Sequence, residues 1–173
     1  MNRCVWRQAV IAYFALIAVS APLGAIAHAA TVVALGASNT YGKGVARNQA
    51  YPAQLEAMLR AKGLSVRVIN AGINGDTTGG MLSRLDGAVP KGTSAVILQP
   101  GGNDRRKGSG ADRAGNIAEI QSRLSAKGVR VIMLENNALH GLPHQLDGVH
   151  LTPEGYRMLA ETLVSQVAGA VGR

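Results

Sequence analysis

The 173-residue chain has one cysteine, at position 4, and few aromatic residues: one Trp, four Tyr and one Phe. A single cysteine excludes an intrachain disulfide framework, so packing must stabilise the fold. So few aromatic side chains leave no stacking platform for single-stranded nucleic acid. The formal net charge is +8, but the only basic cluster is Arg105, Arg106 and Lys107. This pattern indicates a solvated basic surface, and we expect no nucleic-acid partner.

The first 29 residues have the pattern of a targeting segment. Arg3 and Arg7 precede a long uncharged apolar stretch, which ends in the small residues of Ala27-His28-Ala29. This order is typical of a secretory signal peptide. An uncleaved membrane anchor is the alternative, because the apolar stretch could just span a bilayer. We expect cleavage, a periplasmic or secreted protein without a stable membrane anchor, and one domain over residues 30–173.

Strand and helix patterns alternate along this domain. Short apolar or alternating runs predict strands over residues 31–36, 64–70, 94–100 and 129–134. Helical spacing predicts helices over residues 51–63, 77–89, 112–128 and 152–171. Thr152 is the expected N-cap of the last helix, with Pro153 at its first position. The alternation predicts an α/β domain with a parallel sheet and helices on both faces.

Chemically functional residues follow all four predicted strands. The segments are "GASN", "NAGINGDTT", "PGGND" and "ENNALHGLPHQLDGVH", in chain order. In an open parallel sheet, ligands bind beyond the carboxyl ends of the strands, and those ends lie at one edge. The site is therefore expected at this edge.

These segments together hold the groups that acyl transfer needs. Ser38 is the candidate nucleophile, and Asp147 lies three residues before His150, so that its carboxylate can accept from one ring nitrogen. An imidazole with an ordinary pKa of about 6.5 suits a general base at neutral pH. The Asn103 amide and the Gly72 backbone N–H are candidate donors to an oxyanion. Each pattern alone is common, but their order and shared edge predict a hydrolytic site.

The order "GAS", "NAGINGDTT", "GGND", "DGVH" resembles the SGNH (GDSL-type) hydrolases, most closely the periplasmic thioesterase/arylesterase branch. The resemblance runs from the first strand to the C-terminal helix. It implies a three-layer αβα flavodoxin-like domain and hydrolysis of esters or thioesters without metal or cofactor. By position it implies a triad of Ser38, Asp147 and His150, and an oxyanion hole made by the Ser38 N–H, Gly72 and Asn103.

The sequence departs from that family in two places. Ala37 replaces the Asp of the Gly-Asp-Ser signature, and only residues 135–146 separate the last predicted strand from Asp147. Related enzymes usually have a further helix and strand there. Because that pair would leave and return at the same sheet edge, its loss still allows the triad to assemble. We predict a mainly parallel sheet shortened to four strands, a shallower pocket, and short to medium acyl substrates.

Two other functions fit parts of the sequence. His140, His144 and His150, with Asp147, could hold zinc in a metal-dependent hydrolase, although Pro143 breaks any helix that would align the first two. A non-catalytic binding module on the same fold is the second alternative, since a fold alone does not determine function. The expected partner is a small-molecule or lipid-like acyl ester, and the sequence leaves the oligomeric state open.

Overall fold

The structure, a computed structural model, describes residues 29–172. The predicted signal peptide therefore lies outside the described residues, except for its last position. Within the described part of the chain, no helix combines the length and apolar character needed to cross a membrane.

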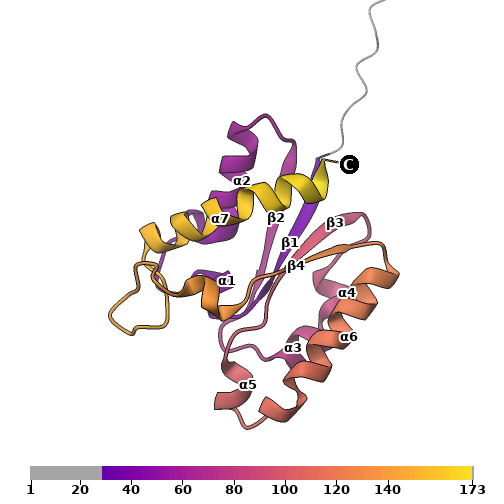
Figure 1. Cartoon of the computed structure of the whole chain (residues 1–173), viewed down its shortest axis with the longest axis vertical. Coiled ribbons are helices and arrows are strands. Elements are labelled where there is room, and N and C mark those ends of the chain that lie inside the picture. Colours follow the sequence, from indigo (N-terminus) through magenta and orange to yellow (C-terminus); the bar gives the residue numbers. More distant parts are fainter. Residues whose placement is uncertain (1–28, 173) are drawn as a thin grey trace, which may run out of the picture.

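Four parallel strands form one sheet, in the order β2-β1-β3-β4 (Figure 1). The strands are β1 (Ala30–Gly36), β2 (Val66–Gly72), β3 (Thr93–Gln99) and β4 (Arg130–Met133). The shortened, parallel sheet that the sequence predicts is thus confirmed. The short strand β4 pairs with β3 and is the last strand in this order.

Helices connect the strands and flank the sheet. The α-helices are α1 (Ser38–Tyr41), α2 (Tyr51–Ala61), α3 (Thr78–Ser83), α4 (Leu85–Ala88), α5 (Asn103–Arg106), α6 (Arg113–Ala126) and α7 (Pro153–Val171). Short 3-10 turns are η1 (Arg47–Gln49), η2 (Gly110–Asp112) and η3 (Asn136–Leu139). Thr152 caps α7 as expected, because its Oγ1 accepts from the Gly155 N–H at 3.1 Å.

Both faces of the central strands are buried, which explains their unbroken apolar sequences. In β1, Val32 and Ala34 pack into one core cluster, and Val33 and Leu35 pack into the other. Successive side chains of a strand point to opposite faces, so a strand covered on both sides needs apolar residues throughout. Helices α2 and α7 cover the first face, while α3, α4 and α6 cover the second (Figure 1). The predicted three-layer αβα arrangement is confirmed.

Strand β2 begins two residues later than the sequence pattern predicts. Leu64 still belongs to the end of α2, because its N–H donates to Leu59 O at 3.1 Å while Gly63 N–H donates to Arg60 O at 2.9 Å. Gly63 has a φ of +78°, which this left-handed helix ending requires. The strand then runs on to Gly72, so β2 reaches further toward the predicted site edge than expected.

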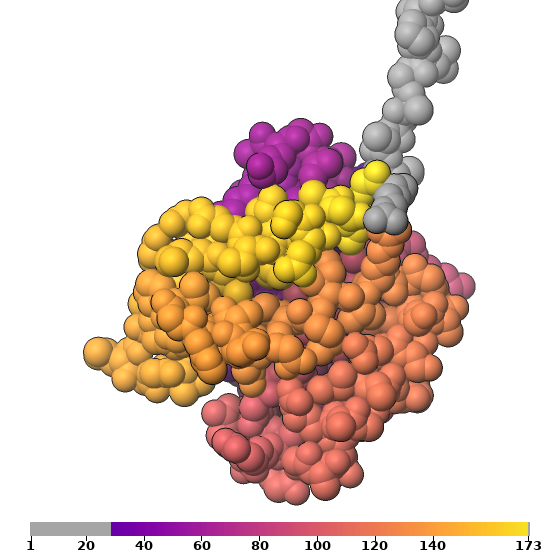
Figure 2. Space-filling view, in the orientation of Figure 1, coloured from indigo at the N-terminus to yellow at the C-terminus, as the bar shows by residue number. Residues whose placement is uncertain are grey.

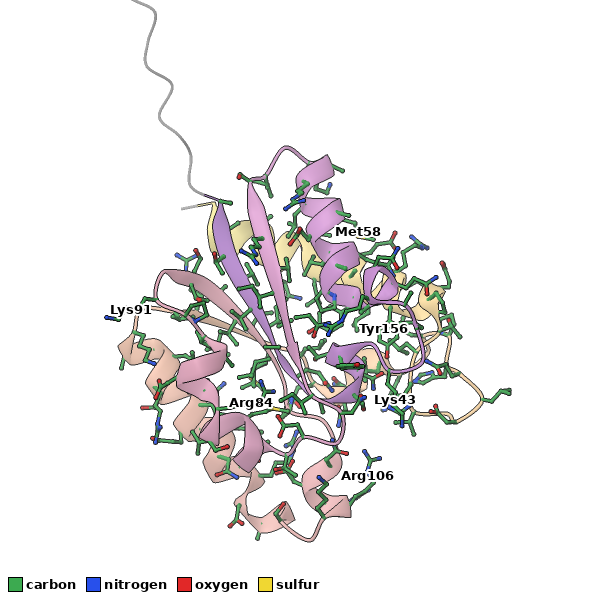
Figure 3. The ribbon with its side chains drawn as sticks, turned by 180° about the vertical axis from the view of Figure 1, so that it is seen from behind. Lys43, Met58, Arg84, Lys91, Arg106 and Tyr156 are labelled. Atoms are coloured by element: carbon green, nitrogen blue, oxygen red, sulfur yellow. The ribbon has the colours of Figure 1, made fainter. Side chains whose placement is uncertain are left out.

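The expected helix over residues 77–89 is two short helices. The break is at Arg84, which lies between α3 and α4. The Arg84 side chain turns inward, where Nε donates to Asp76 Oδ2 at 2.9 Å and Nη2 donates to Gly36 O at 3.3 Å. Figure 3 shows Arg84 beneath the sheet, between the helices and the ends of the strands. This contact joins the β2–α3 loop to the end of β1.

Two buried tyrosines predict a loss of stability at alkaline pH. Burial raises the pKa of Tyr156 to about 12, and burial also raises the pKa of Tyr51. In the unfolded chain both phenols ionise near pH 10. Between about pH 10 and 12 the unfolded state therefore binds fewer protons than the folded state, and the free energy of unfolding must fall as pH rises.

Urea unfolding at a series of pH values checks this expectation. The wild type should lose stability steadily above about pH 10, and Tyr156→Phe should show a shallower loss because one of the two shifted groups is gone. Equal slopes for the two proteins would contradict the assignment of this loss to Tyr156.

Candidate active site

A chain of two hydrogen bonds joins Ser38, His150 and Asp147. Ser38 Oγ lies 2.9 Å from His150 Nε2, and His150 Nδ1 lies 2.5 Å from Asp147 Oδ2. An ionised carboxylate only accepts hydrogen bonds, so Nδ1 carries the ring proton and Nε2 is free to accept the Ser38 O–H. Ser38 and His150 are 9% and 7% exposed, so solvent competes little for the bond between them.

Asp147 is fixed in its ionised form. Besides the His150 ring, its carboxylate accepts from the backbone N–H groups of Val149 and His150, each at 2.9 Å. The hydrogen bond from the His150 side chain, followed by those from the two backbone N–H groups, holds the pKa of Asp147 well below its usual range. Hence the carboxylate can orient the imidazole and stabilise its protonated form.

The α1 helix presents Ser38 at its first turn. Strand β1 ends at Gly36, where a β-carbon would collide with Thr40 Oγ1 and approach Gln99 O to 2.9 Å, so only glycine fits this tight turn. Ala37 is the N-cap of α1, and its side chain makes no capping hydrogen bond. The first N–H groups of a helix have no partner within the helix, so the Ser38 N–H is available to a ligand.

Asn39 ties α1 to the loop that carries His150. Its Nδ2 donates to Val149 O at 3.1 Å, and its Oδ1 accepts from the Tyr156 O–H at 3.0 Å. The sequence motifs indicate no such role for Asn39. Its buried position, 7% exposed, lets one amide hold the His150 loop and helix α7 at once.

Gln145 holds the same loop from the other side. Its Nε2 donates to Lys43 O and to Leu151 O, each at 2.8 Å, while its backbone N–H donates to His150 O at 2.7 Å. An antiparallel bridge between His144 and Leu151 closes the base of the loop. The segment between η3 and α7 projects from the body of the molecule in Figure 2, yet Gln145 near its base binds Lys43 O in the turn that follows α1.

The Asn103 amide lines the same cavity as Ser38. Asn103 is the first residue of α5 and is 6% exposed. Its Nδ2 donates to Asp76 O at 2.7 Å, and its Oδ1 accepts from Arg106 Nη2 at 2.5 Å. An amide nitrogen has two N–H groups, so the second N–H is available to a ligand.

Gly72 does not present its N–H to that cavity. It lies within β2, where its N–H donates to Asn70 Oδ1 at 3.0 Å and a β-carbon would collide with the Tyr41 backbone. Gly75, which the sequence reasoning passed over, has a φ of +74° in a turn closed by the bond from Asp76 N–H to Ile73 O. No acceptor for the Gly75 N–H is found among residues 29–172. Asn103 binds the carbonyl of the residue next to Gly75.

The cavity at Ser38 has a volume of about 210 Å³. Its walls come from α1, the segment before α5, η3 and the His150 loop. The lining residues are Ala37, Ser38, Asn39, Gln99, Gly101, Gly102, Asn103, Arg106, Asn136, Leu139, His140, His144, Gly148 and Val149. The short connection after β4 therefore builds one wall of the cavity, since η3 occupies the start of it.

The three histidines of the zinc alternative do not converge. His144 Nδ1 lies 2.7 Å from Leu142 O, and the His150 ring is engaged by Asp147 and Ser38. No group of three or more His, Cys, Asp or Glu side chains suited to a metal ion occurs in the described part of the chain. His140 and His144 line the cavity instead.

Comparison with known proteins identifies the family. The sequence profile of the GDSL-like lipase/acylhydrolase family matches residues 34–146. The chain belongs to this family. The match ends one residue before Asp147, so the placement of Asp147 and His150 in the site rests on the hydrogen bonds described above.

Two relatives within the family are named as esterases. Esterase TesA of Pseudomonas aeruginosa is 34% identical over 110 residues, covering 62% of this chain and 55% of TesA. An arylesterase of Vibrio mimicus is 30% identical over 106 residues, covering 60% of this chain and 53% of the relative. The chain thus matches about half the length of these two proteins.

Solved structures share the fold. AlinE4, an SGNH-hydrolase family esterase, superposes with a TM-score of 0.63 at 25% identity, over 85% of this chain and 99% of AlinE4. A crystal structure of TesA superposes with a TM-score of 0.72 at 24% identity, over 81% of this chain and 99% of the TesA chain. The esterase EstA from Pseudoalteromonas sp. superposes with a TM-score of 0.71 at 16% identity, over 83% of this chain and 99% of the EstA chain. The last two likenesses bear on the fold alone.

Gly155→Ala tests how the His150 loop is positioned. A β-carbon at Gly155 would collide with Pro143 O, in the loop base, whereas one at Gly169 of the same helix meets nothing within 4 Å. Gly155→Ala should therefore displace the loop and lower the rate of ester hydrolysis. Gly169→Ala should keep the rate and raise the free energy of unfolding by about 0.5–1 kcal/mol through helix propensity.

Kinetics with p-nitrophenyl butyrate and urea unfolding of both variants make this comparison. A Gly155→Ala protein as active as Gly169→Ala would show that the loop base does not set the position of His150.

Proposed function

We propose that the protein is an exported serine hydrolase that cleaves short- to medium-chain acyl esters or thioesters. The observation that carries this proposal is the 2.9 Å hydrogen bond between Ser38 Oγ and His150 Nε2 at the wall of a cavity. Membership of the lipase/acylhydrolase family and the likeness to two esterases support the same reaction class.

The proposed reaction begins with attack by Ser38. His150 Nε2 takes the hydroxyl proton as Oγ bonds to the acyl carbonyl carbon, and Asp147 stabilises the imidazolium that forms. The tetrahedral intermediate collapses when Nε2–H gives its proton to the leaving alkoxide or thiolate, which leaves the acyl group on Ser38. Water then gives a proton to His150 and attacks the acyl carbon, which releases the acid and restores Ser38.

Backbone and amide N–H groups stabilise the oxyanion in this mechanism. In this proposal the Ser38 N–H and the second N–H of Asn103 are two of the donors. We assign the third donor to the Gly75 N–H in place of Gly72, because the Gly72 N–H already binds Asn70 Oδ1. Such fixed donors act where negative charge develops and need no reorganisation during the reaction.

The size and composition of the cavity support a small acyl substrate. Its volume of about 210 Å³ lies below the range of about 300–1,000 Å³ that is usual for sites of drug-sized ligands. No Phe, Trp or Tyr side chain among the described residues lines it. The basic, apolar and small residues over positions 1–29 support export to the periplasm or the medium.

Replacement of the nucleophile is the first test of this function. Ser38→Ala should lower kcat for p-nitrophenyl acetate and butyrate by about a thousandfold or more, because no covalent intermediate can form. Ser125→Ala, which removes an exposed hydroxyl from α6, should keep the wild-type rate. A Ser38→Ala protein as fast as the wild type would refute the mechanism, and activity abolished by EDTA and restored by zinc would favour the metal-dependent alternative.

Asn103→Ala tests the oxyanion donors. Loss of one such donor typically lowers kcat about 100- to 1,000-fold with a smaller effect on KM, because the interaction forms only as the oxyanion does. Asn48→Ala, at an exposed position in η1 outside the cavity lining, is the matched control. A change confined to KM would assign Asn103 to substrate binding instead.

A further inference from the structure

A group of basic side chains lies directly beside the reacting centre. Arg105, Arg106 and Lys107 follow Asn103 in the chain, and all three are exposed. Arg113 begins helix α6 after the short turn η2 and is half-buried. Figure 3 shows Arg106 on α5, at the end of the sheet where the loops of the site gather.

Three of these side chains line a second hollow, which adjoins the cavity at Ser38. The hollow is lined by Gly101, Gly102, Arg105, Arg106, Arg113 and Asn136. Gly101, Gly102, Arg106 and Asn136 also line the cavity at Ser38. The two spaces therefore share a wall, and a ligand in the first can extend into the second.

Few carboxylates lie close enough to neutralise the guanidinium groups that line this hollow. Glu135 Oε2 lies 3.8 Å from Arg113 Nη2, and no other carboxylate among residues 29–172 lies within 4.0 Å of the three guanidinium groups. Asp104 is adjacent in sequence but fully buried, and its Oδ1 accepts from the Thr78 Oγ1–H at 2.5 Å. The hollow thus carries a net positive charge that a ligand can neutralise.

Arg106 links the positive charge of the hollow to the Asn103 amide. Its Nη2 donates to Asn103 Oδ1 at 2.5 Å, and the Nδ2 of the same amide is the proposed oxyanion donor. A carbonyl oxygen bound by that Nδ2 would therefore be separated from the guanidinium group by a single side-chain amide. A group bound in the hollow would belong to the substrate itself, close to its ester bond.

We propose that this hollow, bounded by Arg105, Arg106 and Arg113, is an anion subsite that selects esters bearing a carboxylate or phosphate group near the scissile bond. The inference rests on the proposed esterase function and deepens it. Guanidinium groups bind carboxylates and phosphates in bidentate fashion, and a positive cleft raises the local concentration of an anionic substrate. The anion can be carried by the acyl part or by the alcohol part.

Matched pairs of esters test the subsite and separate the two positions of the anion. For the acyl part, mono-p-nitrophenyl glutarate is compared with its methyl ester. For the alcohol part, para-acetoxybenzoate is compared with its methyl ester. In one of the two pairs, kcat/KM at low ionic strength should be about tenfold higher for the anionic member, and the ratio should fall in high salt.

Charge-neutralising variants assign the preference to particular arginines. Arg105→Gln/Arg113→Gln leaves Arg106 and its bond to Asn103 in place, and it should lower the anionic-to-neutral ratio about fivefold or more. Lys62→Gln/Lys91→Gln removes the same charge from exposed positions outside both spaces. Figure 3 shows Lys91 on the far side of the molecule from Arg106. This control should keep the wild-type ratio. A ratio near one in both ester pairs, or an equal fall in both variants, overturns the subsite.

Binding to an inactive protein separates this inference from the esterase function. Ser38→Ala should bind the preferred anionic ester more tightly than its neutral partner, and adding Arg105→Gln/Arg113→Gln should remove the difference. Hydrolysis of neutral esters that depends on Ser38, without an arginine-dependent preference, leaves the esterase function standing and refutes the subsite. Arginine-dependent binding without hydrolysis of any ester refutes the esterase function instead.

Discussion

The hydrogen bond between Ser38 and His150 is the contact on which the proposed chemistry of this protein depends. It joins residues 112 positions apart, one at the end of the first strand and the other just before the last helix. Neither residue holds the other in place: a hydroxyl and an imidazole form one modest bond. Their approach is set by the surrounding structure, chiefly by the Asn39 amide, which binds both the His150 loop and Tyr156 of α7.

The short connection between β4 and Asp147 explains how a sheet of four strands can retain the contact between Ser38 and His150. The Leu134 N–H donates to Leu98 O at 2.9 Å, so the chain leaves the sheet at the same edge as β3. The turn η3 follows at once, and Asn136 Oδ1 accepts from Gln99 Nε2 at 3.2 Å. The connection therefore stays on the site face, where it forms a wall of the cavity before the loop delivers His150 to Ser38.

Local patterns predicted most of the fold, because burial on two faces and helix capping are properties of short segments. The apolar runs of β1 and β3 and the Thr152-Pro153 helix start are of this kind. Features that depend on side chains from distant segments were missed or misplaced. Arg84 lies at the break between α3 and α4 and binds Asp76 Oδ2 and Gly36 O, and nothing in the local pattern indicates those contacts.

The same distinction holds within the site. The sequence motifs predict site roles for four residues: Ser38, Asn103, Asp147 and His150. The structure places all four side chains around one edge of the sheet. Gly72 was chosen by its position in a motif, but the partner of a backbone N–H depends on where the strand ends. Strand β2 runs to Gly72, and the left-handed turn at Gly75, whose N–H has no acceptor among residues 29–172, comes three residues later. The "NGDT" segment contained that signal, since Asn-Gly favours such turns.

Mass spectrometry of a covalent adduct shows most directly whether Ser38 is a nucleophile activated by His150. The intact protein is treated with a fluorophosphonate probe, digested, and its modified peptide is sequenced. We expect one adduct, on Ser38, and its loss in His150→Ala, because the hydroxyl is a weak nucleophile without its base. An adduct on a different residue, or labelling of Ser38 that persists without His150, would contradict it.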